Sequence, residues 1–547
     1  MWRLKKRRLA VCLGMVGMFL VYIVRIEIIN SYDNRRLKEI SLFDYSITPI
    51  EIDFDIESYI SGEKHSTDDK FHKHSFNHEM SDATAIDRTI PDSRSKNCEA
   101  ATYSIPSSYS VSVVISFHNE ARSALLRTIF SILNRTPSIL LKEIILIDDF
   151  SDDAKDGSEL RELPKVRIFR NNQRQGLARS RMIGVQKSTG SHVIFLDSHC
   201  EVNTDWLPPL LQTVFLHPKA LVSPVIDIID ADTFQYNPAT GDLKGGFDWA
   251  LNYRWQSVSE GEDKNQGHSN FFKSPVMQGG LFLANKSWFN EIGGFDKGLN
   301  IWGAENIEIS IKTWLCGGQI LTVPCSRVGH VFRNHHPYSF PPNGSLPTYL
   351  RNSRRVAEAW LDEYKYQFYD VKPEAKKHDT GSLENILSVK RRLKCKPFQW
   401  YLNNVYPELK PLSKDDLALG QLQQEDMCLQ SQNSSISKSS VVLMPCSPSK
   451  IEQEWRFAKS GELHQGNLCL TARMNLKKPK VYLTKCTNHV SQKWSRRRRS
   501  LMLRGLCLEN AMDSKSGRFH LTLSPCRRKA FSQSWDFSVE LQMWGDR

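Results

Sequence analysis

The tripeptide Asp197-Ser198-His199 carries the clearest chemical signal in this sequence. It follows the apolar run 193–196, which has the character of a short buried strand. In extended backbone, residues i and i+2 point to the same side, so the carboxylate and the imidazole can face one ligand. This pair of donors suits a borderline divalent ion such as Mn²⁺. A hydrogen-bonded Asp–His pair at a strand end is the alternative, and the tripeptide alone leaves both open.

The elements that must hold this pair follow a regular alternation. Short apolar runs with strand character alternate with stretches whose apolar residues recur at helical spacing. This alternation predicts a doubly wound α/β sheet with parallel strands. Ligands bind in such sheets beyond the carboxyl ends of the strands, where the polar clusters lie. The expected strands are 111–116, 143–147, 166–169 and 193–196, the expected helices are 125–133 and 176–186, and the polar clusters are His118-Asn119-Glu120, Asp148-Asp149 and Asp197-Ser198-His199.

From about residue 418 the chain contains a threefold repeat. Each unit has Cys-Leu-x, a second Cys 17 to 19 positions later, and then Gln-x-Trp. Self-similarity at ~40 residues indicates a repeat architecture. Short β runs within the units predict β-hairpins, each with one internal disulfide and a Trp in a shared core. The cysteines are Cys428 and Cys446, Cys469 and Cys486, and Cys507 and Cys526, followed by Trp455, Trp494 and Trp535.

The N-terminus has the pattern of a membrane anchor. Five cations lie in the first eight residues, and residues 9–29 are predominantly apolar. This length is close to the ~20 residues that span a bilayer. A cleaved signal peptide is the alternative, but no small-residue cleavage site follows, which favours a retained anchor. The basic flank predicts a cytoplasmic tail at 1–8, with the rest of the chain in the lumen or outside the cell.

The remaining composition fits a globular protein of several domains in an oxidising compartment. The 547 residues are 40% hydrophobic and 24% charged, and eleven of the twelve cysteines lie beyond the anchor. Residues 30–95 are polar and charged without a sustained period, which predicts a stem. Glycosylation sequons are permissive for a glycoprotein and occur at Asn134, Asn285, Asn343 and Asn433.

The net charge of +13 does not by itself identify a partner. A basic chain can bind nucleic acid, but no nucleic-acid motif is present, so we expect no nucleic-acid partner. The block Arg496 to Arg499 contributes strongly to the charge. A basic cleft for an anionic substrate and a solvated basic face both remain open.

The sequence resembles the polypeptide N-acetylgalactosaminyltransferases over about residues 85–540. The resemblance rests on many segments in order rather than on one motif. They are SFHNEARSALLRT (116–128), EIILIDDFSDD (143–153), FLDSHCE (195–201), GGFDW (245–249), WGAENIEIS (302–310), CSRVGHVFR (325–333), RNSRRVAEAWLDEYK (351–365) and CKPFQWYLNNVYPEL (395–409).

The resemblance implies an architecture and a location. It implies a GT-A, Rossmann-like α/β catalytic domain at 96–410, a linker at 411–417 and an all-β, ricin B-type trefoil lectin domain at 418–540. With the tail at 1–8, the anchor at 9–29 and the stem at 30–95, the chain would be a single-pass type II protein of the Golgi membrane with a luminal catalytic domain.

The resemblance also implies the site residues. Asp197, His199 and His330 match a Mn²⁺ site, although no spacing ties His330 to the other two. Trp302, Glu305 and Arg333 match catalytic positions. Arg333 and Tyr338 lie in segment 331–344, whose glycine and prolines fit a hinged lid over UDP. The positions expected to bind the donor are Ser116, His118, Asp149, Arg174, Asp197, Ser198, Trp302, Arg333 and Tyr338.

The implied activity is retaining transfer of GalNAc from UDP-GalNAc to Ser or Thr hydroxyls of polypeptides or glycopeptides, which initiates mucin-type O-glycosylation. The favoured mechanism has no carboxylate nucleophile: the departing phosphate takes the hydroxyl proton, and positioning and electrostatics supply catalysis. Two alternatives stay open. One is a weak or inactive homologue that acts as a binding or scaffold protein in the Golgi, and the other is a related enzyme with a different nucleotide sugar.

The resemblance pairs Cys98 with Cys325 and Cys316 with Cys395, and leaves Cys200 over. We expect Cys200 to be a buried free thiol beside the metal loop rather than a catalytic group.

Two features depart from the family pattern. Ala304 stands where the family usually has a second glycine, and alanine would be strained there if the position needs positive φ. In the repeats, the usual sugar-binding Asp and His are replaced while the folding residues persist. The replacing residues are Gln430, Thr471 and Glu509, and Ser447, Thr487 and Arg527. We therefore predict a trefoil with weak or absent GalNAc binding.

Overall fold

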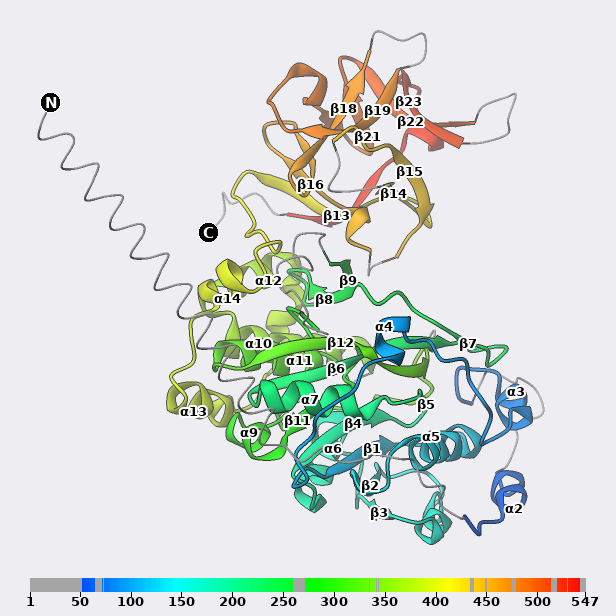
Figure 1. Cartoon of the computed structure of the whole chain (residues 1–547). Coiled ribbons are helices and arrows are strands. Elements are labelled where there is room, and N and C mark those ends of the chain that lie inside the picture. Colours follow the sequence, from blue (N-terminus) through cyan, green and yellow to red (C-terminus); the bar gives the residue numbers. More distant parts are fainter. Residues whose placement is uncertain are drawn as a thin grey trace, which may run out of the picture.

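The computed structural model shows an α/β body joined to an all-β body (Figure 1). It describes residues 52–63, 71, 73–258, 271–333, 335–340, 342, 344–432, 437–447, 450–474, 479–512, 519–528 and 530–541. The expected tail at 1–8 and anchor at 9–29 lie outside these ranges. Within them, no helix combines the length and apolar character needed to cross a bilayer.

A ten-stranded sheet forms the centre of the α/β body, with the main order β10-β12-β6-β11-β4-β1-β2-β3. The parallel strands expected from the sequence are present, in the order β3-β2-β1-β4. They are β1 (Val111–Phe117), β2 (Leu141–Asp148), β3 (Val166–Arg170) and β4 (His192–Asp197).

The sheet is mixed rather than wholly parallel. β11 (Phe282–Asn285) runs antiparallel to both of its neighbours, β4 and β6 (Ala220–Ile229). Between β6 and β11 the described part of the chain forms four short strands and no crossover helix. These strands are β7 (Tyr236–Asn237), β8 (Leu243–Phe247), β9 (Tyr253–Ser257) and β10 (Phe272–Lys273).

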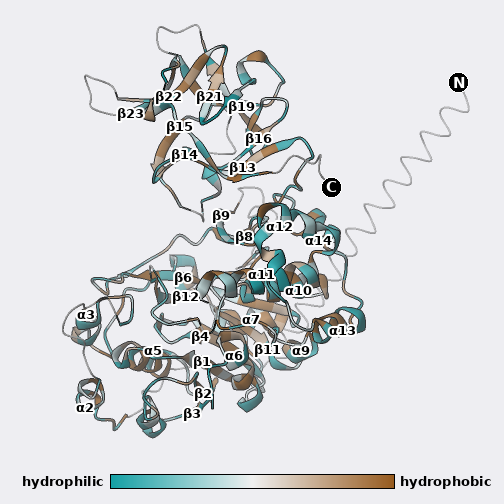
Figure 2. Ribbon diagram, turned by 180° about the vertical axis from the view of Figure 1, so that it is seen from behind, coloured by the Kyte–Doolittle hydropathy of each residue, from teal (hydrophilic) through white to brown (hydrophobic). Residues whose placement is uncertain are grey.

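Helices cover both faces of this sheet, and the strand residues alternate between two cores. Val113 and Ile194 pack in one core with α5 and α7, whereas Val114 and Phe195 pack in the other with α6, α10 and α11. Burial on both faces explains why these strands are continuous apolar runs. Figure 2 shows hydrophobic residues, in brown, gathered in the central sheet. The helices are α5 (Arg122–Arg135), α6 (Leu177–Lys187), α7 (Leu207–Leu216), α9 (Lys286–Glu291), α10 (Glu305–Leu315), α11 (Ser345–Trp360), α12 (Lys365–Val371), α13 (Glu384–Arg392) and α14 (Phe398–Asn404).

The long strand β12 (Gln319–Val331) connects distant parts of the sequence. It pairs in parallel with β6 and, near its end, antiparallel with the short strand β5 (Cys200–Val202). In this register His330 lies opposite Cys200. The strand pairing therefore places His330 beside the Asp197-Ser198-His199 turn.

Part of the segment expected to be a stem packs against the α/β body. Helices α2 (Ile56–Ser61) and α3 (His78–Ala83) both contact α5, and α4 (Lys96–Glu99) follows them. Tyr59, Phe76 and Ile86 are buried. These apolar residues are few and irregularly spaced in a polar sequence, so no period indicated that they would be covered.

The all-β body contains three similar units around a shared core. Trp455, Trp494 and Trp535 are buried, and the indole nitrogen of each donates a hydrogen bond of 2.7–2.9 Å to a leucine carbonyl of its own unit. Its strands are β13 (Asp416–Gln424), β14 (Met427–Ser431), β15 (Val441–Pro445), β16 (Glu454–Ala458), β17 (Leu463–Gln465), β18 (Leu468–Arg473), β19 (Lys480–Lys485), β20 (Ser495–Arg497), β21 (Ser500–Leu503), β22 (Leu506–Met512), β23 (Phe519–Pro525) and β24 (Asp536–Glu540).

Five disulfides stabilise the described part of the chain. Two lie in the α/β body and one in each unit of the all-β body, while Cys200 is a buried free thiol. These are the pairs expected from the sequence: Cys98–Cys325, Cys316–Cys395, Cys428–Cys446, Cys469–Cys486 and Cys507–Cys526.

The two bodies meet through an ion pair and a strand-like contact. Arg254 on β9 lies 3.2 Å from Glu454 on β16 and also bonds Asp248 at 2.6 Å. Next to it, Trp255 forms an isolated β-bridge with Lys450. The β8–β9 hairpin thus lies between the main sheet and the all-β body (Figure 1).

Helix α10 begins after a residue in the left-handed region. Ala304 has φ 68° and is buried. An L-residue with a Cβ atom pays about 1–2 kcal/mol there, whereas glycine pays nothing. The strain foreseen for alanine at this position is therefore present.

We predict that Ala304→Gly raises the melting temperature by about 1–3 °C. The relieved strain of about 1–2 kcal/mol exceeds the ~0.4–1 kcal/mol of unfolded-chain entropy that glycine adds. Differential scanning calorimetry measures the shift. Ala304→Val is the matched control and should lower the melting temperature, because a β-branched side chain tolerates positive φ poorly. A decrease with Ala304→Gly would show that the buried methyl group matters more than the strain.

Candidate active site

A cavity of about 470 Å³ lies at the carboxyl ends of β1, β2 and β4. A volume of this size suits a small-molecule ligand. Most residues expected to act in the site line it, whereas Glu305 does not. The lining includes Ser116, His118, Asp149, Arg174, Asp197, Ser198, His199, Trp302, His330, Arg333 and Tyr338.

Three metal-capable side chains converge on one side of this cavity. Asp197 ends β4, His199 lies in the following turn and His330 comes from β12. One donor atom from each lies within 4.8 Å of the other two. The Oδ2 atom of Asp197 is 3.1 Å from Nε2 of His330, and the two imidazole centres are 4.7 Å apart.

The charges around these three residues also suit a cation. Burial would raise the pKa of Asp197, but the hydrogen bond from His330 and the charge of Arg181 lower it well below its usual value. Burial, together with the nearby charge of Arg333, lowers the pKa of His199 to about 4. Near neutral pH this leaves a carboxylate and a neutral imidazole, which are the protonation states that bind metal. The three residues therefore fit a divalent ion with imidazole and carboxylate ligands.

Glu120 holds the Asp197-Ser198-His199 turn from behind. Its Oε2 atom is 2.8 Å from Nδ1 of His199 and accepts a 2.6 Å hydrogen bond from Ser198, while Oε1 accepts one from Arg333 at 2.5 Å. Burial would raise the pKa of Glu120, but Arg333 and His199 keep it well below its usual value. A carboxylate on the remote nitrogen of a ligand histidine fixes the ring orientation and its tautomer.

Arg181 plays a similar part for Asp197. This residue of α6 is almost fully buried, and its Nη2 atom donates a 2.7 Å hydrogen bond to Oδ1 of Asp197. The guanidinium also lies against the rings of Phe195 and Phe295. With Oδ1 bound in this way, Oδ2 is the oxygen directed toward His330.

Asp149 organises the loop that leads into α6. Its two oxygens accept hydrogen bonds from Asn171, Arg174 and the backbone of Gln175 and Gly176. An ionised carboxylate has about four acceptor positions, so these contacts use them all. Asp149 was expected to bind the donor. For one of its oxygens to accept a hydrogen bond from the donor, Arg174 would have to move.

Aromatic rings form the opposite wall. Trp302 lies 4.3 Å from the ring of His336, and Tyr338 lies 5.3 Å from it. The guanidinium of Arg174 stacks on Tyr338 at 5.3 Å. Segment 331–344 was expected to be a lid. Its rings, His336 and Tyr338, line the cavity together with Arg333.

Glu305 is buried behind this wall. It accepts a 2.7 Å hydrogen bond from the backbone of Gly303, and burial raises its pKa. The structure therefore places it under the Trp302 loop rather than on the cavity surface.

Several buried polar atoms around the cavity have no hydrogen-bond partner among the described residues. They are Oγ of Ser116, Nδ1 of His330, Nε of Arg333, and Nε and Nη1 of Arg181. Buried polar groups are seldom left unsatisfied. Ser116, His330 and Arg333 line the cavity, whereas Arg181 lies behind Asp197.

Sequence reasoning did not assign roles to Glu120 and Arg181. Glu120 lies in a polar cluster after β1, which was a usable signal. No signal in the sequence marks Arg181, because a single arginine in a helix is usually exposed.

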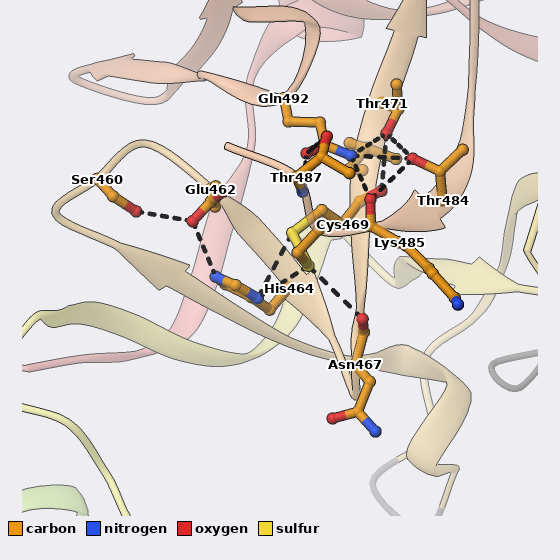
Figure 3. The surroundings of a disulfide bond; sticks show 12 residues. Ser460, Glu462, His464, Asn467, Cys469, Thr471, Thr484, Lys485, Thr487 and Gln492 are labelled. Atoms are coloured by element: carbon orange, nitrogen blue, oxygen red, sulfur yellow. Dashed lines mark hydrogen bonds and ion pairs between the residues drawn. A yellow bond between two sulfur atoms is a disulfide. The ribbon is translucent and has the colours of Figure 1, made fainter. Parts of the chain in front are cut away.

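The residues that replace the usual sugar-binding Asp in the all-β body, Gln430, Thr471 and Glu509, form hydrogen bonds within their own units. Figure 3 shows the second unit, where Thr471, Thr484 and Gln492 form one cluster. Nε2 of Gln492 donates to both threonines at 2.9–3.0 Å. His464 lies beside the Cys469–Cys486 disulfide, 3.4 Å from the nearer sulfur.

The other two units follow the same principle. In the first, Gln453 donates to Gln430 at 3.0 Å and accepts from the backbone of Ser447. In the third, Glu509 accepts from Arg527, Ser532 and Gln533, among others. The glutamine of each Gln-x-Trp motif therefore hydrogen-bonds the residue that follows Cys-Leu in its own unit.

Comparisons with family models and known proteins agree with this architecture. Residues 112–293 match "Glycosyl transferase family 2", residues 269–337 match "N-terminal domain of galactosyltransferase", and residues 418–535 match "Ricin-type beta-trefoil lectin domain". Human polypeptide N-acetylgalactosaminyltransferase 14 is 41% identical over 497 residues, which cover 88% of this chain and 89% of the relative. Polypeptide N-acetylgalactosaminyltransferase 4 of Caenorhabditis elegans is 42% identical over 442 residues, which cover 80% and 74%.

A solved structure also matches. The crystal structure of GalNAc-T7 with UDP, GalNAc and Mn²⁺ is 30% identical, with a TM-score of 0.59 over 90% of this chain and 92% of that one. The expected GT-A fold and ricin-type trefoil are thus confirmed. Because identity above 40% extends over most of the chain, the protein belongs to the polypeptide N-acetylgalactosaminyltransferase family.

Proposed function

We propose that this protein transfers GalNAc from UDP-GalNAc to Ser or Thr hydroxyls of polypeptides, with retention of configuration. The observation that carries the proposal is the cavity in which Asp197, His199 and His330 meet and which Arg174 and Arg333 also line. Relatives of this length and identity are named for this activity, and the GalNAc-T7 structure contains UDP, GalNAc and Mn²⁺. The test is UDP release from UDP-GalNAc in the presence of Mn²⁺ and a Thr-rich peptide.

Asp197, His199 and His330 would hold Mn²⁺, which when bound supplies positive charge to stabilise a departing diphosphate. The protein's own cations contribute in the same direction. Arg333 lies beside His199, and Arg174 faces the cavity from the opposite side. Both guanidinium groups can bind phosphate oxygens through a planar fork. Ser116 and His118, at the end of β1, are placed to bind the nucleoside.

The carboxylates of the cavity support front-face transfer rather than a covalent intermediate. Glu120, Asp149 and Asp197 each bond an arginine, and Glu305 is turned away under the Trp302 loop. Among the described residues that line the cavity, no carboxylate is free to attack an anomeric carbon. We infer that the acceptor hydroxyl attacks on the leaving-group face and that a β-phosphate oxygen takes its proton.

The aromatic wall would position the sugar and exclude water. Trp302 offers an exposed ring face, and Tyr338 and His336 lie on the segment beside it. Closure of such a segment strengthens electrostatic interactions in the site by removing solvent.

We further propose a type II anchor at 9–29 and a luminal location in the Golgi. The five disulfides support an oxidising compartment. An inactive scaffold protein is the second candidate, and the strained Ala304 and the internally bonded lectin positions favour it. UDP release separates the two, and competition between UDP-sugars identifies the donor.

We predict that Asp197→Ala or His330→Ala reduces peptide-dependent UDP release at least about 100-fold, because each removes one of three ligands. The measurement is UDP release with Mn²⁺ in excess. Asp242→Ala, which changes an exposed carboxylate away from the cavity, is the matched control and should retain activity. Full activity of Asp197→Ala would exclude the proposed metal site.

We predict that Glu120→Gln lowers kcat by about 10–100-fold with a smaller effect on KM. His199 and Arg333 would lose the charged acceptor that orients them. Steady-state kinetics with varied UDP-GalNAc checks this, and the exposed Glu159→Gln is the control. An unchanged kcat would show that the two residues keep their positions without Glu120.

We predict that the trefoil does not retain the protein on GalNAc-Sepharose, because its polar positions are already hydrogen-bonded within each unit. A GalNAc-binding trefoil lectin serves as the positive control. Firm retention that free GalNAc reverses would contradict the prediction.

A further inference from the structure

A second cluster of metal-capable side chains lies outside the cavity, in the segment before β1. Glu63 follows α2, His74 lies in the following stretch, and His78 is the first residue of α3. One donor atom from each lies within 4.8 Å of the other two. Asp82, one helical turn after His78, brings a second carboxylate to within 3.6 Å of Nε2 of His78, although it does not share the mutual distance of the other three residues.

The distances within this cluster are close to those of a tetrahedral zinc site. Zinc–nitrogen and zinc–oxygen bonds of ~2.0–2.2 Å put tetrahedral ligands about 3.4 Å apart. Here Nε2 of His74 is 2.9 Å from Oε1 of Glu63, and Nε2 of His78 is 3.4 Å from Oε2 of Glu63. The same His78 atom is 3.6 Å from Oδ1 of Asp82. Adjustments of a few tenths of an ångström would suffice for Glu63, His74 and His78, whereas the Asp82 carboxylate would also have to turn toward Glu63 and His74.

The surroundings also suit a metal ion. The side chains of Glu63, His74 and His78 are all less than a tenth exposed. Two carboxylates would balance the charge of a divalent ion bound by uncharged imidazoles, which is the condition for burying it.

One cation already contacts the cluster. Nζ of Lys73 lies 2.5 Å from Oε1 of Glu63, and the lysine side chain is 38% exposed. Its flexible stem allows the ammonium to withdraw into solvent when another cation binds Glu63. Lys73 is therefore a competitor of the metal rather than part of its site.

We propose that Glu63, His74, His78 and Asp82 form a zinc site, distinct from the Asp197, His199 and His330 cluster. Two imidazoles with carboxylates favour zinc over the hard cations that prefer oxygen ligands alone. The site would connect the segment before α3 to α5, because Oε2 of Glu63 also accepts a 2.8 Å hydrogen bond from the backbone of Arg122.

Such a site would support the wall of the catalytic cavity. Phe76, two residues after His74, is fully buried, and the guanidinium of Arg333 lies 5.1 Å from the centre of its ring. Helix α5 in turn bonds the metal-binding turn, because Thr128 donates to the Ser198 carbonyl and accepts from the Cys200 amide. The zinc would therefore be structural, and it would act on the cavity through Phe76, through α5 and through the charge interaction between His74 and Glu120.

The test uses the full-length chain in detergent, purified with a histidine-free tag and stripped of metal. His330→Ala is the background, so that the catalytic cluster does not contribute. Titration with Zn²⁺ alone, and with Co²⁺ as a spectroscopic probe, should show one tightly bound equivalent and the visible absorption of four-coordinate cobalt. Adding His74→Gln and His78→Gln should weaken zinc binding at least about ten-fold and abolish that absorption.

Two further variants exclude trivial explanations. His489→Gln removes an exposed histidine of the all-β body and should leave the stoichiometry unchanged. Lys73→Ala removes the competing cation and should tighten zinc binding, an outcome that misfolding cannot produce. The proposal would be overturned if three proteins bound zinc equally well. They are the His330→Ala background, the variant that adds His74→Gln and His78→Gln, and the variant that adds Lys73→Ala. These titrations contain neither UDP-GalNAc nor an acceptor peptide, so their result is independent of transferase activity.

Discussion

The pairing of β12 with β5 is the contact on which the catalytic cavity depends. It places His330 opposite Cys200 and therefore beside His199, although 131 positions separate the two histidines. A shift by one residue would turn the His330 side chain to the other face of the sheet, because strand side chains alternate. The parallel pairing of β12 with β6, which is bonded along most of its length, holds this register in place.

Around this pairing, the polar groups of the cavity depend on one another. Arg181 neutralises one oxygen of Asp197, and Glu120 bonds both His199 and Arg333. In a buried environment an unpaired charge is costly, so Arg181 stabilises the ionised form of Asp197 and Arg333 that of Glu120. Because these carboxylates bond arginines, no carboxylate among the described residues that line the cavity is free to act as a nucleophile. The proposed transfer therefore depends on positioning and electrostatics.

The two parts that flank the catalytic sheet have different relations to it. The segment of α2 and α3 packs on α5 and reaches Arg333 through Phe76, so it belongs to the architecture of the cavity. The trefoil contacts the β8–β9 hairpin through Arg254 and Glu454 and keeps its three tryptophans in one core. Its units retain the residues that fold them, while Gln430, Thr471 and Glu509 bond within the protein. In this domain the residues that form the core are therefore different from the residues at the Cys-Leu-x positions.

The sequence by itself determined the strands β1 to β4, the helices α5 and α6, the three disulfide-linked units and the Asp197-Ser198-His199 turn. These features depend on local periodicity and on short-range spacing, because a strand buried on both faces must be apolar and a repeat must show its period. The family resemblance added His330, Arg333 and Trp302. Only the tertiary structure decided that β11 runs antiparallel, that Glu120 and Arg181 brace the metal-binding turn, and that Phe76 lies under Arg333. Each of these results from contacts between residues far apart in the chain, and no local pattern records such a contact.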